Sequence, residues 1–457
     1  MTPRRLTLVA MHVRQRVRAA RSSTYARNVG SLLVGSTVSQ LLPIALAPVM
    51  TRLYAPADYG ALAICMSVSG IVSVLVTSQY TQAILLPRRR AEAVNLLAVS
   101  TAASLLIAAM LGIALVVARQ GVARLIGDAT GTPWLLAVPP VVFCNGLIAA
   151  LTLWLTRERE FGTLSATRIT QAAATSALQL GVGFTVGGPI GLIGAYLAGS
   201  VIGAAILVVR FWNRDRRYLR LLSLHRSSRL VRVQANFLFY VLPADLLNTV
   251  TNQWPTLLLM KLVGAASTGF YSLTQRVISL PMGFVGSSVF EVFRQRAVAE
   301  YHERGNCRAA FVSTFRILAL LGIGPTLVIL FLGPQLFSLI FGAEWGLAGE
   351  YARALSVLMF LRFVVSPLTY VYYIAGRQRE DLVLHIVMIV TTVLAMWGGY
   401  RLFRSGLGAV SMFAANYSAI YVLYLVRSYQ LAGGDRRTLR APGLLTKEVP
   451  PGLRTVP

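Results

Sequence analysis

Long apolar stretches recur along the whole of this chain and are separated by short polar or basic segments. A helix needs about 20 apolar residues to cross a bilayer core of about 30 Å. Twelve stretches fit that requirement, and they predict an all-α, polytopic membrane protein. The expected spans lie near 29–50, 58–83, 95–118, 133–155, 165–187, 189–211, 236–258, 263–290, 310–332, 351–374, 382–400 and 405–427.

Basic residues fall almost wholly on alternate sides of these spans. With the N-terminus placed in the cytoplasm, 32 of the 43 Lys and Arg residues lie on the cytoplasmic side and 6 on the opposite side. Basic segments resist translocation, so the richer side stays in the cytoplasm. The asymmetry predicts an even number of spans with both termini cytoplasmic. The first span follows a basic tail, and we expect an uncleaved membrane anchor there.

The same boundaries predict the domain organisation. A basic cytoplasmic tail covers 1–28, and spans 1–6 form an N-terminal lobe over 29–211. A basic cytoplasmic linker at 212–235 leads to a C-terminal lobe over 236–427, which contains spans 7–12. The remaining residues, 428–457, are expected to form a disordered cytoplasmic tail.

A faint internal repeat relates the two halves. The aligned residues are Arg52, Leu53, Ala57 and Gly60 in the first half, and Lys261, Leu262, Ala266 and Gly269 in the second. The offset is 209 residues, and each segment is the short outer turn after an odd-numbered span. Both halves therefore enter the membrane from the same side, which predicts a parallel repeat about an axis along the membrane normal.

The net charge of +27 comes almost entirely from arginine. It is divided into short patches on one membrane face, where anionic membrane lipids are the expected partners rather than nucleic acid. No loop is long enough for a soluble catalytic domain. Neither Lys261 nor Lys447 follows a glycine, so a Walker A loop is absent. The cysteines and histidines lack metal-binding spacing. We expect a transporter without cofactor or metal, not an enzyme, driven by an ion gradient or substrate supply.

Polar residues inside the predicted spans are the candidate functional groups. Asp245 is the only carboxylate deep within a span, about 13 Å from its cytoplasmic end, and Arg276 lies about 21 Å into the next span. Asn248 and Asn252 share a helical face with Asp245 because they follow it by three and seven residues. This stripe either binds helices together or faces substrate or ion. Asp245 is thus predicted to couple an ion or to act as a counter-ion.

Other cationic and amide side chains extend this set. Arg362 lies near mid-membrane in the tenth span, and Gln40 belongs to a polar patch in the first. Arg52 and Lys261 are at the outer mouth of each half, where they act either as interfacial anchors or as a cationic gate for an anionic headgroup. Two arginines nearer the cytoplasmic ends of their spans are expected to snorkel to the interface, namely Arg168 and Arg316.

Several segments resemble one known family. They are PVMTRLYAPADYG at 48–60, GFYSLTQRVISLP at 269–281 and LIFGAEW at 339–345, followed by SP at 366–367 and GRQ at 376–378. In these segments the chain is similar to bacterial oligosaccharide and O-antigen flippases of the multidrug, oligosaccharidyl-lipid and polysaccharide exporter superfamily. One departure is that many relatives have an acidic residue near the end of the second span, where this chain has Gln79 and Gln82.

The resemblance implies two six-helix lobes around a central cavity, alternating access and location in the bacterial inner membrane. It also implies a lipid-linked oligosaccharide on undecaprenyl pyrophosphate as substrate, for O-antigen, capsule or exopolysaccharide assembly beside a polysaccharide polymerase and chain-length proteins. Arginine binds phosphate oxygens with paired hydrogen bonds. The predicted substrate-binding residues are therefore Arg276, Arg362, Arg52, Lys261, Asn248, Asn252 and Gln40.

Three alternatives stay open. A peptidoglycan-precursor flippase differs mainly in its substrate. A cation-coupled drug exporter of the same superfamily requires a cavity rich in acids, which Asp245 alone supplies. A polysaccharide polymerase or ligase requires a large outer loop, and no predicted outer loop exceeds about twenty residues.

Overall fold

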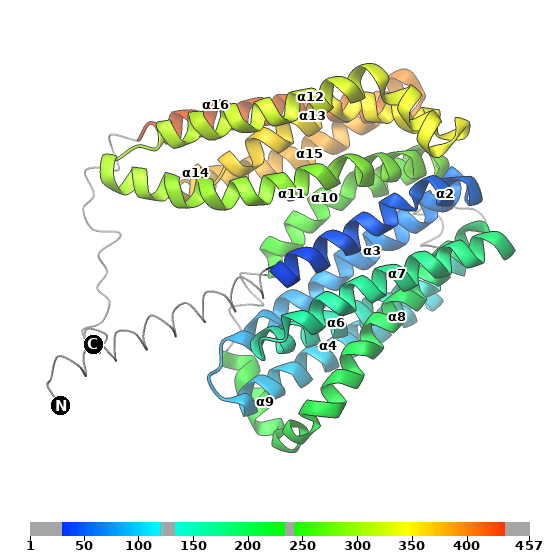
Figure 1. Cartoon of the computed structure of the whole chain (residues 1–457), viewed down its shortest axis with the longest axis vertical. Coiled ribbons are helices and arrows are strands. Elements are labelled where there is room, and N and C mark those ends of the chain that lie inside the picture. The colour runs from blue at the N-terminus through cyan, green and yellow to red at the C-terminus, as the bar shows by residue number, and fades with distance from the viewer. Residues whose placement is uncertain (1–29, 119–120, 122–132, 234–241, 435–457) are drawn as a thin grey trace, which may run out of the picture. The chain divides into compact units, whose positions relative to one another are not determined.

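The computed structural model describes residues 30–118, 121, 133–233 and 242–434, and every regular element in them is a helix (Figure 1). The predicted tail at 1–28 and most of the tail at 428–457 lie outside the described residues. The longer helices are α3 (Pro56–Tyr80), α4 (Arg90–Val117), α6 (Val138–Arg157), α7 (Phe161–Thr185), α8 (Gly188–Asp215), α10 (Leu242–Leu262), α11 (Ala265–Arg304), α12 (Arg308–Phe341), α13 (Gly346–Leu368), α15 (Gln378–Phe403) and α16 (Gly406–Ala432). The shorter ones are α2 (Ala47–Leu53), η1 (Gln82–Leu85), η2 (Pro133–Ala137), η3 (Arg216–Leu221), α9 (Leu224–Val233), η5 (Ala343–Trp345) and α14 (Val371–Ile374).

Nine helical segments of the described residues are long and apolar enough to cross a membrane. They are Gly30–Leu53, Pro56–Thr77, Arg90–Val117, Trp134–Arg157, Gly188–Leu221, Arg308–Phe341, Ala343–Ile374, Gln378–Phe403 and Gly406–Ala432. Three further predicted spans correspond to α7, α10 and α11, which have 25, 21 and 40 residues but carry more polar side chains. The predicted all-helical, multi-pass membrane fold is confirmed.

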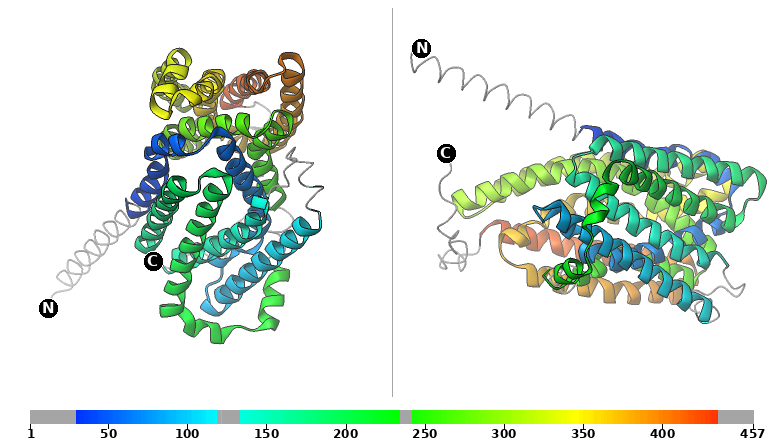
Figure 2. Two further views of the ribbon diagram at one scale, coloured as in Figure 1. Left: turned by 90° about the vertical axis from the view of Figure 1, so that its right-hand side faces the viewer. Right: turned by 90° about the horizontal axis from the view of Figure 1, so that it is seen from below.

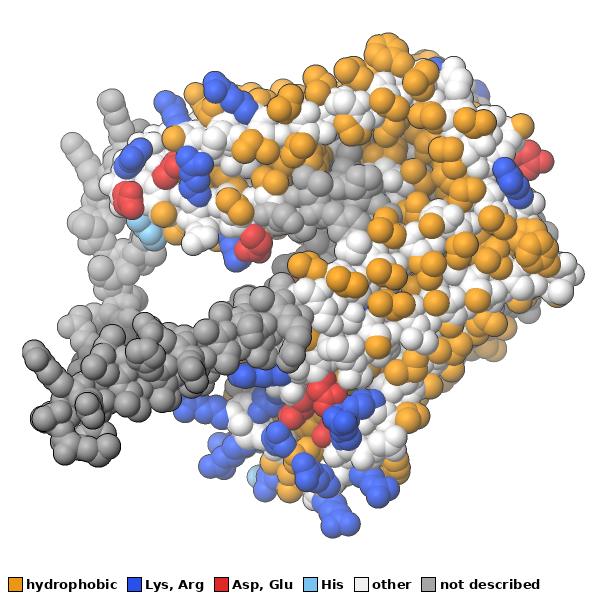
Figure 3. Space-filling view, viewed as in Figure 1, with side chains coloured by type: hydrophobic (Ala, Val, Ile, Leu, Met, Phe, Trp, Pro, Cys, Tyr) orange, Lys and Arg blue, Asp and Glu red, His pale blue; other side chains and the backbone are white. Residues whose placement is uncertain are grey.

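Hydrophobic side chains cover much of the visible helical surface (Figure 3). On α12, Leu320 and Leu339 are each 78% exposed, and Val117 at the end of α4 is 81% exposed. Water-soluble proteins rarely expose apolar patches of this extent. Lipid is therefore the solvent that this surface fits, and the apolar faces of the helices need no protein partner.

The chain divides into two compact units, Met1–Ser272 and Leu273–Pro457. In the first unit the helices run alongside one another as a bundle (Figure 2). There α3 packs against α6, α8 and α10, while α4 packs against α6 and α7 against α8. The helix α10, which the sequence assigns to the C-terminal lobe, belongs to this first unit. The division into lobes at 212–235 stays a prediction of the sequence topology.

In the second unit, α12 and α13 form a closely packed pair, and α16 packs against α13 and α15. Gly349 permits this close packing, because a Cβ added there would lie 2.4 Å from the Cα of Pro334. The fully buried Thr274 of α11 donates its hydroxyl hydrogen bond to the Ala348 carbonyl over 2.8 Å. That bond fixes α11 to the start of α13.

The segment predicted as a basic linker is largely helical, since α8 extends to Asp215 and is followed by η3 and α9. Asn95 of α4 is fully buried and holds this segment in place. Its Oδ1 accepts hydrogen bonds from the Ser223 backbone N–H (2.9 Å) and the Ser227 hydroxyl (3.0 Å). Its Nδ2 donates to the Leu221 carbonyl over 3.0 Å. One buried amide thus sets the position of the basic helix α9.

Candidate functional site

Three of the predicted site residues lie along α10. Asp245 is in the first turn of the helix and is half-buried, whereas Asn248 and Asn252 are exposed. The Asn252 Nδ2 donates to the Asn248 carbonyl over 2.9 Å and to its Oδ1 over 3.3 Å. This contact aligns two amides along one side of the helix. Because residues 234–241 lie outside the described residues, the membrane depth of Asp245 stays a prediction.

A neighbouring amide, which sequence reasoning missed, joins α10 to α3. The Ser67 hydroxyl donates to the Gln253 Oε1 over 2.9 Å, and Ser67 is 3% exposed. A polar side chain buried in an apolar bundle needs such a partner. The bond fixes the rotation of α10 about its axis, and therefore the direction in which its other polar residues point.

Arg52 and Lys261 occupy matching places in the structure. Arg52 lies in the last turn of α2 and Lys261 in the last turn of α10, and both side chains are exposed. Each precedes a short turn into the next long helix, α3 or α11. Gln40 is exposed on the segment Gly30–Leu53, one turn after Ser36. The equivalent positions of Arg52 and Lys261 agree with the internal repeat.

A symmetric contact between α3 and α11 supports that repeat more strongly. A Cβ added to Gly60 would lie 1.9 Å from the Ala265 carbonyl oxygen, and one added to Gly269 would lie 1.8 Å from the Pro56 carbonyl oxygen. The offset of 209 residues converts Pro56 to Ala265 and Gly60 to Gly269. Gly60 therefore contacts Ala265, while Gly269 contacts Pro56, the repeat equivalent of Ala265. This reciprocal pattern is expected of a local two-fold axis.

The two predicted mid-membrane arginines are in the second unit. Arg276 is half-buried on α11, two residues after Thr274, and Arg362 is exposed on α13. The Arg362 guanidinium is close enough to the hydroxyls of Tyr417 and Tyr421 on α16 to interact with them electrostatically. Asp245 belongs to the first unit, so its pairing with Arg276 stays a prediction.

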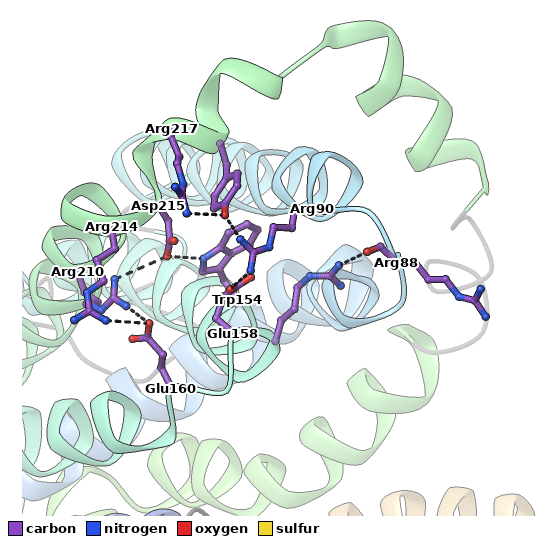
Figure 4. Close-up of polar contacts among 11 residues, drawn as sticks. Arg88, Arg90, Trp154, Glu158, Glu160, Arg210, Arg214, Asp215 and Arg217 are labelled. Atoms are coloured by element: carbon purple, nitrogen blue, oxygen red, sulfur yellow. Dashed lines mark hydrogen bonds and ion pairs between the residues drawn. The ribbon is translucent and has the colours of Figure 1, made fainter.

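Sequence reasoning also missed a network of ion pairs where α6, α7 and α8 end or begin (Figure 4). Glu160 pairs with Arg210 and lies 3.7 Å from Arg214. Asp215 accepts a 3.1 Å hydrogen bond from the Nε1 of Trp154, which is fully buried. The half-buried Glu160 and the buried Asp215 hold the ends of these helices together, because opposite charges attract more strongly where water is sparse.

Tyr218 extends the network to α4. The guanidinium carbons of Arg90 and Arg217 lie 5.1 and 5.0 Å from the centre of its ring, and both side chains donate to its hydroxyl (Figure 4). Arg90 also pairs with Glu158 at 2.8 Å. Only 16 acidic residues occur in the chain. The presence of three of them among arginines predicted to lie on the cytoplasmic side was therefore an available signal of a structural network.

The three cysteines are not part of this ion-pair network. Cys65, Cys144 and Cys307 are free and buried. Cys307 lies between α11 and α12, and burial, reinforced by the Glu300 carboxylate, raises the pKa of its thiol to about 11. This thiol is therefore protonated at neutral pH and unreactive. Within the described residues, no group of three or more His, Cys, Asp or Glu side chains could hold a metal ion.

Comparison with known proteins identifies the family. The family described as polysaccharide biosynthesis protein matches residues 49–348, more than half of the chain. The chain belongs to the polysaccharide biosynthesis protein family. It is also 23% identical over 365 residues to the succinoglycan biosynthesis transport protein ExoT of Rhizobium meliloti, across 78% of this chain and 70% of ExoT. The resemblance inferred from the sequence segments is confirmed.

Solved structures agree on the fold of this family member. An inward-facing multidrug resistance MATE transporter of the MOP superfamily matches with a TM-score of 0.69 and 16% identity, over 87% of this chain and 97% of that one. The lipid II flippase MurJ, in an inward closed conformation, matches with a TM-score of 0.66 and 14% identity, over 88% and 89% of the two chains. The protein is thus a member of the polysaccharide biosynthesis protein family whose fold is similar to the folds of these two proteins.

Proposed function

We propose that this transporter flips undecaprenyl-pyrophosphate-linked oligosaccharide across the bacterial inner membrane by alternating access and has no enzymatic activity. The flipped lipid is the substrate for O-antigen, capsule or exopolysaccharide assembly, in which a polysaccharide polymerase and chain-length proteins act next. The observation that carries the proposal is the presence of Arg276 and Arg362 within long membrane helices. Such costly residues usually have a function, and guanidinium groups match pyrophosphate oxygens in charge and geometry.

The other predicted residues complete a surface for a sugar phosphate. The amides of Asn248, Asn252 and Gln40 both donate and accept hydrogen bonds, as sugar hydroxyls require. Arg52 and Lys261 attract the anionic headgroup at the outer mouth, and Asp245 acts as counter-ion or coupling-ion ligand. The sugar crosses between the helices while the polyprenyl chain stays in lipid.

The contact between α3 and α11 supports alternating access. Gly60 and Gly269 let the two helix ends meet through backbone atoms. We infer that this contact closes the outer side of the pathway and opens when the substrate leaves.

Anionic lipids of the cytoplasmic leaflet are the proposed partners of α9. This helix carries Arg226, Arg229 and Arg232, while Leu230 and Val231 pack against the core of the first unit. A basic helix held against the bundle by apolar contacts attracts anionic headgroups near the membrane surface, at about 1 kcal/mol per basic residue. These contacts would hold both termini on the cytoplasmic side.

The test is complementation of a strain that lacks its oligosaccharide flippase. Arg276→Ala and Arg362→Ala should each abolish surface glycan while membrane abundance stays normal. Arg353→Ala is the matched control, because Arg353 is also on α13 but binds Glu350 and the Leu330 carbonyl, each at 3.1 Å. Full glycan in both site variants would remove these arginines from the pathway. Growth arrest with intact glycan on depletion would instead support a peptidoglycan-precursor flippase.

A further inference from the structure

A cavity of about 430 Å³ lies within the first unit, between α6, α7 and α8. Cavities of about 300–1,000 Å³ are large enough to bind small ligands or headgroups. The walls combine aliphatic side chains with five polar ones, and none of these belongs to the substrate surface proposed above. The polar residues are Asn145, Thr152, Thr167, Arg168 and Gln171.

The position of Arg168 at this cavity is fixed by neighbouring contacts. Its Nη1 donates to the Ser36 hydroxyl over 2.6 Å. One turn earlier on α7, the Ser165 hydroxyl donates to the Ser31 carbonyl over 2.8 Å. A Cβ added to Gly35 would lie 2.1 Å from the Ser165 Oγ, so the two helices are in close contact here. The guanidinium is therefore anchored to the first span, and differs from a side chain that extends freely to the interface.

Within the described part of the chain, the charge of Arg168 has no acidic partner. Among the residues that the structure describes, no carboxylate pairs with it, and the acids nearest in the chain, Glu158 and Glu160, pair with Arg90 and Arg210. Ser36 accepts from one of the five N–H donors of the guanidinium. Arg168 is exposed, so its other N–H donors can bind an anion.

Two neutral side chains add hydrogen-bonding groups beside this charge. Gln171 follows Arg168 by three residues, so the two side chains lie on the same side of α7. On α8, Gly203 leaves room for that amide, since a Cβ there would lie 2.7 Å from the Gln171 Oε1. Thr152 contributes a hydroxyl from α6. A guanidinium, an amide and a hydroxyl around one space are the donors that bind phosphate oxygens.

We propose that this cavity binds the phosphate group of a lipid, with Arg168 as the main ligand and Gln171 and Thr152 as supporting donors. The aliphatic walls suit the adjoining lipid chain. Two lipids carry this chemistry, namely a polyprenyl pyrophosphate and an anionic phospholipid. Binding of the polyprenyl pyrophosphate rests on the proposed function, whereas the existence of the phosphate site does not.

The test measures lipid binding to the purified full-length protein in detergent by native mass spectrometry. The probes are undecaprenyl pyrophosphate, undecaprenol and phosphatidylglycerol. Arg168→Gln loses a charge-assisted hydrogen bond. It should therefore bind the two phosphate lipids at least about 10-fold more weakly than the wild type does. Arg316→Gln is the matched control, since Arg316 is the ninth residue of α12 as Arg168 is the eighth of α7, but does not line this cavity. It should bind all three lipids like the wild type.

Each outcome has one meaning. Selective loss of undecaprenyl pyrophosphate binding in Arg168→Gln identifies a carrier-lipid site, selective loss of phosphatidylglycerol a phospholipid site, and loss of both a general phosphate site. Unchanged binding of both phosphate lipids overturns the proposal, as does equal weakening of undecaprenol. If Arg168→Gln does not fold, Thr152→Val decides, because it keeps the charge and should still weaken phosphate-lipid binding several-fold. Failure of the proposed function would appear separately, as absent glycan complementation by the wild-type protein.

Discussion

Replacing Gly269 by alanine tests the symmetric contact between α3 and α11. The new Cβ would lie 1.8 Å from the Pro56 carbonyl oxygen, whereas real Cβ contacts are essentially never shorter than 3.0 Å. Both atoms belong to, or are attached directly to, the backbone, so no side-chain rotation relieves the clash. The helices must move apart, and overpacking of this kind typically costs about 1–3 kcal/mol. We expect a lower thermal unfolding temperature and reduced transport.

The repeat makes the experiment more specific, because Gly60→Ala should have a similar effect through the Ala265 carbonyl, at 1.9 Å. One separation of the helix ends relieves both clashes. The double variant should therefore lose less stability than the sum of the two single variants, as expected for coupled sites. Gly194→Ala is the control, since no atom lies within 4 Å of the added Cβ. Alanine in an open helical position is about 0.5–1 kcal/mol more favourable than glycine.

The measurements are thermal unfolding of the purified variants in detergent and surface glycan in the complemented strain. If the contact forms only in one state of the transport cycle, a cost of about 1–3 kcal/mol shifts the balance between states about 5- to 150-fold. Transport would then fall by more than the change in unfolding temperature predicts. Gly269→Ala and Gly60→Ala proteins that unfold and transport like Gly194→Ala would refute the close contact and the symmetry derived from it.

Two further predictions concern topology and charge. A reporter fused at residue 430 should be active only in a cytoplasmic format, because 32 basic residues are predicted on that side against 6 outside, and periplasmic activity would contradict the span count. Asp245→Asn and Arg276→Gln should each lower membrane abundance if the two residues pair, since breaking a buried pair costs about 3–5 kcal/mol, and the double variant should recover it. If Asp245 instead binds the coupling ion, Asp245→Asn should fold normally but lose gradient-dependent transport. Wild-type glycan in Asp245→Asn would contradict both roles.

The membrane fold could be predicted because it depends on local composition. Each span needs only enough apolar residues in sequence, and the described helices follow the predicted stretches closely. The predicted ends were least accurate for α11 and α12, which run to Arg304 and Phe341 instead of residues 290 and 332.

Side-chain partners could not be predicted, because they join residues far apart in the chain. Ser36 lies 132 residues before Arg168, and the sequence alone therefore predicts simple snorkelling for this arginine. Asp215 binds Trp154 across 61 residues, on a different helix. The repeat was an exception. Its fixed offset related Gly60 to Gly269 in advance, although only the structure brings their backbones together.

Under the proposed function, the charges of the predicted substrate surface favour an anionic substrate over a cationic drug. Within that surface Arg276 supplies a positive charge and Asp245 a negative one. Arg362 on α13 adds another positive charge. A pathway for cationic drugs would have to desolvate its cargo next to these guanidinium groups, and like charges repel most strongly where water is sparse. A sugar linked through pyrophosphate gains attraction from the same groups, so the residues that make a drug pathway costly make a lipid-phosphate pathway favourable.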